Sequence, residues 1–286
     1  MAFDQFEQLT CFTVDIQDKV AHIKLNRPDA LNAMNKEFWN ELPEIVQNID
    51  RNALARVIVI SSTGKHFSAG MDLAVFAEDG AVTSQRRDPY IAAERFRSNV
   101  KQIQGSFNAL EEARMPVLFA LHGGVIGGAM DMISAGDIRW CTEDAFFCIQ
   151  ETNIGMTADV GTFPRLQRYV PEGWVKEMAY TGRRYGAADA ERIGLVNGVF
   201  PDHAAMLDHV MTIAKEIASK SPLVVTGCKA LINYGRDHST ADTLDYIGVW
   251  NAGMLPSEHM KEAMTARIEK RDPDFPDLLP LRSTPM

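Results

Sequence analysis

The chain has 286 residues, of which 46% are apolar and 23% are charged. This composition is typical of an ordinary soluble protein that is long enough to bury a large core. The formal net charge of −9 argues against nucleic acid or an anionic membrane as the main partner.

Strand and helix patterns alternate in the first part of the chain. Residues 20–25 (VAHIKL) alternate apolar and polar side chains and predict a strand with one buried face. Residues 35–50 have helical spacing, although Pro43 lies where a proline breaks or kinks a helix. Residues 56–62 (RVIVISS) form a short apolar run, which is typical of a parallel strand covered on both faces.

A glycine-containing loop at residues 62–73 leads to a second series of elements. A helical stripe follows, made by Phe96, Val100, Ile103, Phe107 and Leu110. Strands are predicted at 116–123, 138–142 and 145–150, and a turn at 123–137 leads into a helix. After residue 171 the pattern is mainly helical, apart from a short strand at 197–200, with three or more helices over 202–270. Alternating strands and helices imply an α/β fold with parallel strands.

The four cysteines show neither a CxxC pair nor a metal-ligand spacing, and they predict scattered reduced thiols and no metal site. The first residues lack the basic and apolar regions of a leader, and STPM is not the peroxisomal tripeptide. These observations lead us to expect a cytoplasmic protein.

Two glycine-rich turns follow apolar strands, HFSAGMD at residues 66–72 and GGVIGG at 123–128. Neither is a nucleotide motif, because G-x-G-x-x-G is absent and Gly64-Lys65 continues with His66. Either run alone is compatible with a plain tight turn. Together the two turns could aim one backbone N–H group each at a developing oxyanion.

Two acids, Glu151 and Asp159, lie in FFCIQETNIGMTADVG (residues 146–161) without a Lys or Arg between them; the next basic residue is Arg165. Desolvation and mutual repulsion raise the pKa of at least one such acid. One ionised and one protonated carboxyl group can serve as base and acid. The structural alternatives are that Asp159 caps the following helix and that Asp131 favours the positive end of its own.

Four segments in order resemble the crotonase family, also called the enoyl-CoA hydratase/isomerase superfamily: NRPDALNAMN, GKHFSAGMDL, residues 120–151, and GLVNGVF. The resemblance runs from about residue 10 to residue 270. It implies a spiral of ββα repeats with the acyl-CoA site over residues 1–200 and a C-terminal helical oligomerisation region over 201–286. It also implies a homotrimer or homohexamer.

The resemblance further implies an acyl-CoA thioester substrate, with CoA as part of that substrate and no separate cofactor. By position, the N–H groups of Met71 and Gly128 would hold the thioester oxygen. Contacts with substrate and CoA are implied for Arg27, Ala30, Leu31, Lys65, Ala69, Gly70, Asp72 and Leu73. Arg27 and Lys65 could equally be ordinary solvated cations.

The acids Asp131, Glu151 and Asp159 match the dienoyl-CoA isomerase subfamily, whereas hydratases have Glu at the positions of Asp131 and Glu151. The implied reaction converts 3,5-dienoyl-CoA to 2,4-dienoyl-CoA by proton transfer between C2 and C6. The resemblance slightly favours Asp159 at C2 and Glu151 at C6, and it gives Asp131 the role of orienting Glu151 or tuning its charge.

Alternatives to the isomerase are an enoyl-CoA hydratase or other crotonase-type enzyme, and a noncatalytic acyl-CoA-binding or assembly protein. The stretch at residues 74–96 is either a flap over the acyl chain or a plain surface connection.

Overall fold

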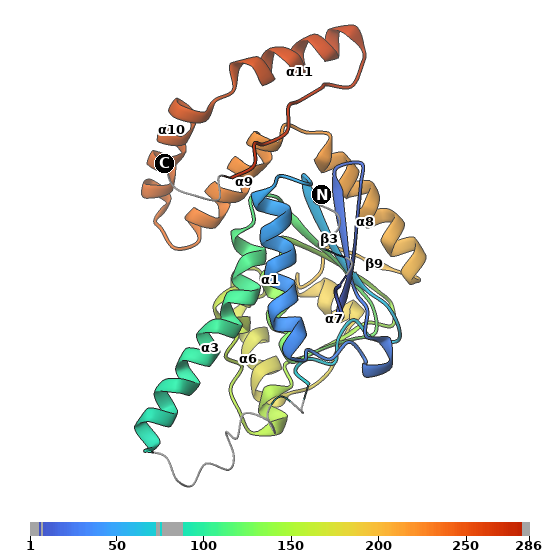
Figure 1. The fold of residues 1–286 in the computed structure, drawn as a ribbon, viewed down its shortest axis with the longest axis vertical. Coiled ribbons are helices and arrows are strands. Elements are labelled where there is room, and N and C mark those ends of the chain that lie inside the picture. The colour runs from blue at the N-terminus through green and yellow to red at the C-terminus, as the bar shows by residue number, and fades with distance from the viewer. Residues whose placement is uncertain (1–5, 7, 73–74, 76–87, 282–286) are drawn as a thin grey trace.

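A computed structural model of the protein describes residues 6, 8–72, 75 and 88–281 (Figure 1). Its main sheet has six strands in the order β1-β2-β3-β4-β6-β9. They span Phe12–Gln17, Val20–Leu25, Val57–Ser62, Val117–Leu121, Ile138–Thr142 and Val199–Phe200. All neighbouring pairs are parallel except β1 and β2. The predicted strands and the parallel α/β sheet are thereby confirmed.

The strand β1 was not predicted, although its sequence FTVDIQ alternates apolar and polar residues as β2 does. It joins β2 through a two-residue turn at Asp18 and Lys19, whose φ angles of 50° and 64° are both positive. Such a turn connects antiparallel strands, so the parallel part of the sheet begins only with β2.

A second, three-stranded sheet holds β5 (Gly124–Ile126), β7 (Phe146–Cys148) and β8 (Tyr185–Gly186). The strand β4 passes into β5, and β6 passes into β7, so the strands from β4 to β7 alternate between the two sheets. Since β5 and β7 are parallel and adjacent, the second glycine turn and the acidic segment after β7 leave this small sheet side by side.

Helices cover both faces of the main sheet. Ile58 and Ile60 of β3 belong to the large core that includes α1 (Lys36–Arg51) and α3 (Pro89–Glu112), whereas Val57 and Val59 pack toward α8 (His203–Ala218). The apolar run of β3 is therefore buried on both faces, as predicted. The helix α1 continues through Pro43, with its first turn capped by the side chain of Asn35.

Of the apolar stripe predicted on α3, only the C-terminal end is buried, at Phe107 and Leu110. Phe96 is 56% exposed, because the N-terminal half of α3 projects beyond the body of the protein (Figure 1). Most of the stretch from 74 to 96 lies outside the described residues, so its predicted role stays a prediction.

The remaining helices are α4 (Gly128–Ser134), η3 (Glu151–Ile154), α5 (Thr162–Leu166), α6 (Glu172–Thr181) and α7 (Ala187–Arg192), followed by α9 (Pro222–Gly235), α10 (Thr240–Met254) and α11 (Ser257–Glu269). The last three lie together at one end of the molecule (Figure 1). The helix α10 has no buried residue in this single chain. None of the helices among the described residues has the length and apolar character needed to cross a membrane. The division of the chain at residue 200 stays a prediction.

Candidate active site

The first glycine turn is held against residues 31–34. The side chain of Asn32 donates to the carbonyls of Thr63 and His66, at 2.7 and 2.9 Å. Met34 N–H donates to Gly70 O and Asp72 N–H donates to Met34 O, at 2.8 and 3.0 Å. In this parallel pairing Met71 lies between two bonded residues, so its own N–H points to the opposite side of the strand.

The second glycine turn brings Gly128 to that opposite side. Gly127 has a φ of +55° and its N–H donates to Cys148 O at 2.9 Å. Gly128 is then the first residue of α4, where an N–H group has no acceptor within its own helix. A Cβ atom on Gly128 would lie 3.7 Å from Met71 N, and one on Gly70 would lie 3.2 Å from Gly128 N. The two predicted N–H donors therefore lie close to one another.

Asp131 is in the first turn of α4 and is 1% exposed. Its Oδ1 accepts hydrogen bonds from Thr162 N at 2.6 Å and from Thr162 Oγ1 at 2.8 Å. Burial raises the pKa of Asp131, the charge of Glu151 raises it further, and the two bonds from Thr162 oppose the rise. The charge of Glu151 thus acts on Asp131, while the hydrogen bonds of Asp131 go to Thr162.

Glu151 begins η3 three residues after the end of β7 at Cys148 and is buried. Its Oε1 lies 3.3 Å from the place that a Cβ on Gly127 would occupy, which puts its carboxyl group beside the second glycine turn. Its Oε2 is buried without a hydrogen-bond partner among the described residues. Burial and the charge of Asp159 raise the pKa of Glu151, although the N–H groups of Glu151 and Gln150 oppose the rise.

Asp159 lies in the segment between η3 and α5 and is half-buried. Burial raises its pKa, opposed by its own N–H group. The helix α5 has Gly161 as its N-cap and no side-chain cap, so Asp159 does not cap it. The charge of Asp159 raises the pKa of both other acids, so the structure brings all three acids within electrostatic range of one another.

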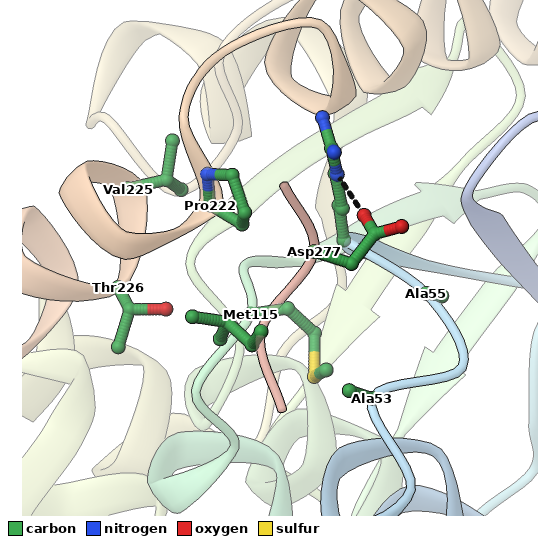
Figure 2. A pocket seen from close by; sticks show the side chains of 9 residues that line it. Ala53, Ala55, Met115, Pro222, Val225, Thr226 and Asp277 are labelled. Carbon is green, nitrogen blue, oxygen red and sulfur yellow. Dashed lines mark hydrogen bonds and ion pairs between the residues drawn. The ribbon is translucent and has the colours of Figure 1, made fainter. Parts of the chain in front are cut away.

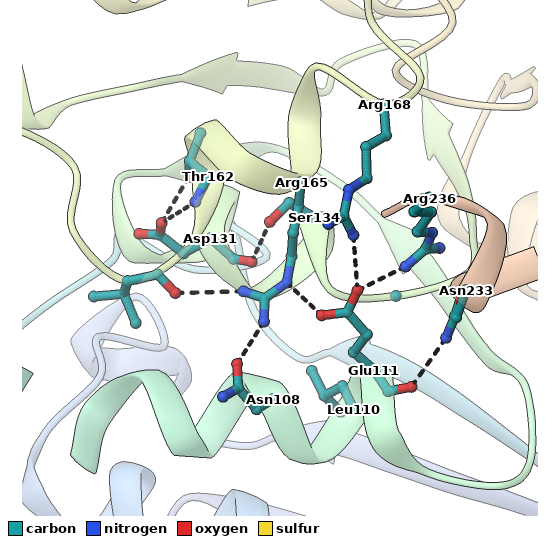
Figure 3. A network of polar contacts seen from close by, with 12 residues as sticks. Asn108, Leu110, Glu111, Asp131, Ser134, Thr162, Arg165, Arg168, Asn233 and Arg236 are labelled. Atoms are coloured by element: carbon teal, nitrogen blue, oxygen red, sulfur yellow. Dashed lines mark hydrogen bonds and ion pairs between the residues drawn. The ribbon is translucent and has the colours of Figure 1, made fainter. Parts of the chain in front are cut away.

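The cation nearest in sequence, Arg165, is engaged elsewhere (Figure 3). It donates to Glu111 at 2.9 Å, to Asn108 at 2.6 Å and to Val160 O at 3.5 Å. A Cβ on Gly161 would lie 2.0 Å from its guanidinium group. Arg165 therefore fixes the segment that carries Asp159 against α3, and its charge is paired with Glu111.

Two further arginines, Arg168 and Arg236, also bond to Glu111, at 3.1 and 2.6 Å. The side chain of Gln104 on α3 holds the acidic segment from the same side, by donating to Asp159 O at 2.6 Å. No pattern in the sequence points to Thr162, Gln104 or this use of Arg165, because each acts on a residue in another element.

Most residues expected to contact substrate lie around the first turn. Ala69 N–H donates to Leu31 O at 3.0 Å, and Arg27 donates to Ala33 O at 2.5 Å and pairs with Asp72 at 3.6 Å. Arg27 is therefore partly buried and stabilises this turn, whereas Lys65 is exposed. Ala30 ends the short helix η2 (Pro28–Ala30), Gly70 is buried, and Leu73 lies outside the described residues.

A hollow elsewhere is closed by the C-terminal segment and has no acid of the cluster in its lining (Figure 2). It lies between Ala53, Met115, Pro222 and Thr226, beside the ion pair of Arg56 and Asp277 at 2.6 Å. It is separate from the candidate site. Among the described residues no three His, Cys, Asp or Glu side chains are grouped so that they could hold a metal ion.

Comparison with known proteins shows which family the chain resembles. The family model described as enoyl-CoA hydratase/isomerase matches residues 15–278. The chain is 38% identical to the peroxisomal Delta(3,5)-Delta(2,4)-dienoyl-CoA isomerase of Arabidopsis thaliana over 278 residues, which cover 97% of this chain and 100% of that protein. It is 41% identical to the mitochondrial enzyme of that name from Homo sapiens, over 90% of this chain and 78% of that one.

Solved structures show the same fold. An enoyl-CoA hydratase from Bacillus anthracis superposes with a TM-score of 0.83 at 29% identity, covering 93% of this chain and 99% of that one. One from Shewanella pealeana gives 0.84 at 22% identity, covering 96% and 99%. The predicted crotonase-like fold is thereby confirmed.

The expected cytoplasmic location is wrong by the same comparison, because the names of these relatives place them in peroxisomes and mitochondria. The expectation rested on composition, on reduced thiols and on the absence of recognisable signals. Composition and thiol state do not name a compartment, since targeting signals are addresses read by receptors and contribute nothing to a fold.

Proposed function

The chain belongs to the enoyl-CoA hydratase/isomerase family, and from this premise we propose that it isomerises 3,5-dienoyl-CoA to 2,4-dienoyl-CoA. The observation that carries the proposal is the cluster of Asp131, Glu151 and Asp159, which has no basic partner among the described residues and lies next to the second glycine turn. The names of the relatives support the choice of substrate.

The thioester oxygen is held by the N–H groups of Met71 and Gly128. When the C2–H bond breaks, its electron pair forms a dienolate and negative charge collects on that oxygen. Two donors fixed in advance stabilise this charge in the transition state, and losing one such donor typically costs about 3–4 kcal/mol. The close approach of the two turns at Gly70 and Gly128 supports this role.

Asp159 is the base and Glu151 the acid. Asp159 is the less buried of the two, so its ionised form is the better hydrated. Glu151 has a buried oxygen without a hydrogen-bond donor among the described residues, which favours the protonated form. Asp159 takes the C2 proton, Glu151 delivers one to C6, and the electron pairs move so that the double bonds shift from C3 and C5 to C2 and C4. Proton exchange through solvent then restores both acids.

We further propose that CoA enters only as part of the substrate, that no separate cofactor takes part, and that Arg27, Ala30, Leu31, Lys65, Ala69, Gly70, Asp72 and Leu73 surround the thioester and CoA. Assembly into a homotrimer or homohexamer through the C-terminal helices is supported by large apolar side chains that a single chain leaves exposed. They are Leu244, Val249, Met264 and Ile268. Light scattering of the purified protein measures this directly.

The test of the function is turnover of two substrates. Purified protein is incubated with 3,5-dienoyl-CoA and, separately, with 2-enoyl-CoA. Isomerisation brings the diene into conjugation with the thioester and shifts its absorbance, whereas hydration consumes the enoyl absorbance. Rapid loss of enoyl absorbance without diene conversion would assign the protein as a hydratase, and no reaction with either substrate would favour the noncatalytic alternative.

A further inference from the structure

Both hydrogen-bond donors of Thr162 bond to the same carboxylate oxygen. Its N–H and its hydroxyl group bond to Asp131 Oδ1 at 2.6 and 2.8 Å, and both residues are 1% exposed. Thr162 is the first residue of α5, and this helix has no side-chain cap from its own N-cap residue. Asp131 therefore caps α5 from another helix, and the bond joins α4 to the segment that carries Asp159.

The neighbouring acid differs at one of its two oxygens, although the N–H groups of Glu151 and Gln150 favour its ionised form. Glu151 Oε2 is buried and has no hydrogen-bond partner among the described residues. Hydrogen bonds donated to a carboxylate favour its ionised form, whereas burial without such bonds favours the protonated form. Two buried acids that repel one another share a single proton more readily than they both ionise.

We propose that Thr162 is a positioning residue for the reaction, which keeps Asp131 ionised and thereby places the shared proton on Glu151. The inference rests on the proposed function, in which Glu151 must be protonated to deliver hydrogen to C6. Asp131 then needs no contact with the substrate, because its role is to hold a negative charge that makes Glu151 the better proton carrier.

The charged groups that face Asp131 disfavour its ionised form, so the bonds from Thr162 have to offset them. Glu151 approaches from η3 and Asp159 from the segment before α5, and both are acids that raise the pKa of Asp131. On α5 itself, Arg165 is paired with Glu111. The strand β5, which contacts α4, contains no titratable residue. Thr162 is thus the group that opposes the protonation of Asp131.

The first test compares pH profiles of kcat for wild type and Thr162→Val, which is isosteric and keeps the N–H bond. Losing a hydroxyl donor to a charged group moves the shared proton toward Asp131 and lowers the plateau of kcat about tenfold, with KM unchanged. The decline of kcat at alkaline pH moves to higher pH. At pH values above this decline the two profiles converge, because Asp131 is then ionised in both proteins and the fraction of protonated Glu151 no longer depends on Thr162.

Two variants control this experiment. Thr162→Ser restores the hydroxyl group and should restore the plateau. Thr142→Val removes an equally buried hydroxyl, bonded to Asp144 at 2.5 Å outside the acid cluster, and should keep the wild-type profile. If Thr162→Val lowers kcat by the same factor at every pH, Thr162 has only a structural role and the proposal is overturned.

A second measurement needs no turnover, so it separates this inference from the proposed function. Infrared spectra at neutral pH detect protonated carboxyl groups, and carbon-13 labelling of glutamate or aspartate assigns the band. In wild type the band should shift with labelled glutamate, and in Thr162→Val a band should shift with labelled aspartate. A wild-type band that shifts with labelled aspartate contradicts the proposal, even if Thr162→Val does not fold.

Discussion

Replacing Gly70 with alanine should separate the N–H groups of Met71 and Gly128 and lower kcat about a hundredfold or more. Gly70 has a φ of +84°, and an added Cβ would lie 2.5 Å from Ile126 O. Ordinary contact begins at 3.4 Å, so the two turns must move apart by about 0.9 Å. A donor works only within about 2.7–3.1 Å of the oxyanion, so a shift of that size removes one donor.

The matched control is Gly194→Ala. Gly194 has nearly the same φ, +81°, but among the described residues other than its chain neighbours its added Cβ would meet only Tyr169 O, at 3.2 Å. Both variants pay the strain of a positive φ, about 1–2 kcal/mol, which urea unfolding measures. Only Gly70→Ala should lose kcat toward 3,5-dienoyl-CoA.

Two results would refute this reasoning. A folded Gly70→Ala enzyme whose kcat stays within about threefold of wild type shows that the oxyanion does not depend on the spacing of the two turns. An equal loss in Gly194→Ala assigns the effect to strain and not to the donors.

The other predictions concern the acids and the arginine behind them. In heavy water Glu151→Gln should still exchange the C2 hydrogen of the substrate while Asp159→Asn should not, and both should lose about 100-fold or more in kcat. The pKa of Asp131 is raised in the folded protein, so wild type is most stable below the unfolded pKa of this residue and loses that stability as the pH rises. Asp131→Asn does not titrate, so it should be more stable than wild type at about pH 8 and equal to it at about pH 3. Arg165→Met should lower the free energy of unfolding by about 3 kcal/mol, because it leaves Asn108 and part of Glu111 without a buried partner.

Each of these predictions has a contrary outcome. Loss of C2 exchange in Glu151→Gln with retention in Asp159→Asn reverses the two roles. A stability difference for Asp131→Asn that does not change with pH shows that Asp131 titrates normally when folded. Arg165→Met can be compared with Lys176→Met, which breaks an exposed pair with Glu172 and should change unfolding little; equal effects contradict the importance of burial.

The sequence by itself determined the elements whose signals are local. The apolar run of β3, the alternation in β2 and the stripe of α1 each follow from the faces that strands and helices bury. Glu151 and Asp159 could be proposed from the sequence because burying carboxyl groups among apolar residues without a nearby cation is costly, whereas Asp131 followed from the family resemblance.

Only the tertiary structure decided how the site is assembled. The two glycine turns meet because Ser68 pairs with Val125, about sixty residues further along the chain. Thr162 reaches Asp131 and Arg165 reaches Glu111 only after α5 docks between α4 and α3. Hydrogen bonds between distant elements leave no periodic pattern in a sequence, because their geometry depends on how the sheets and helices pack and not on the spacing of residues along the chain.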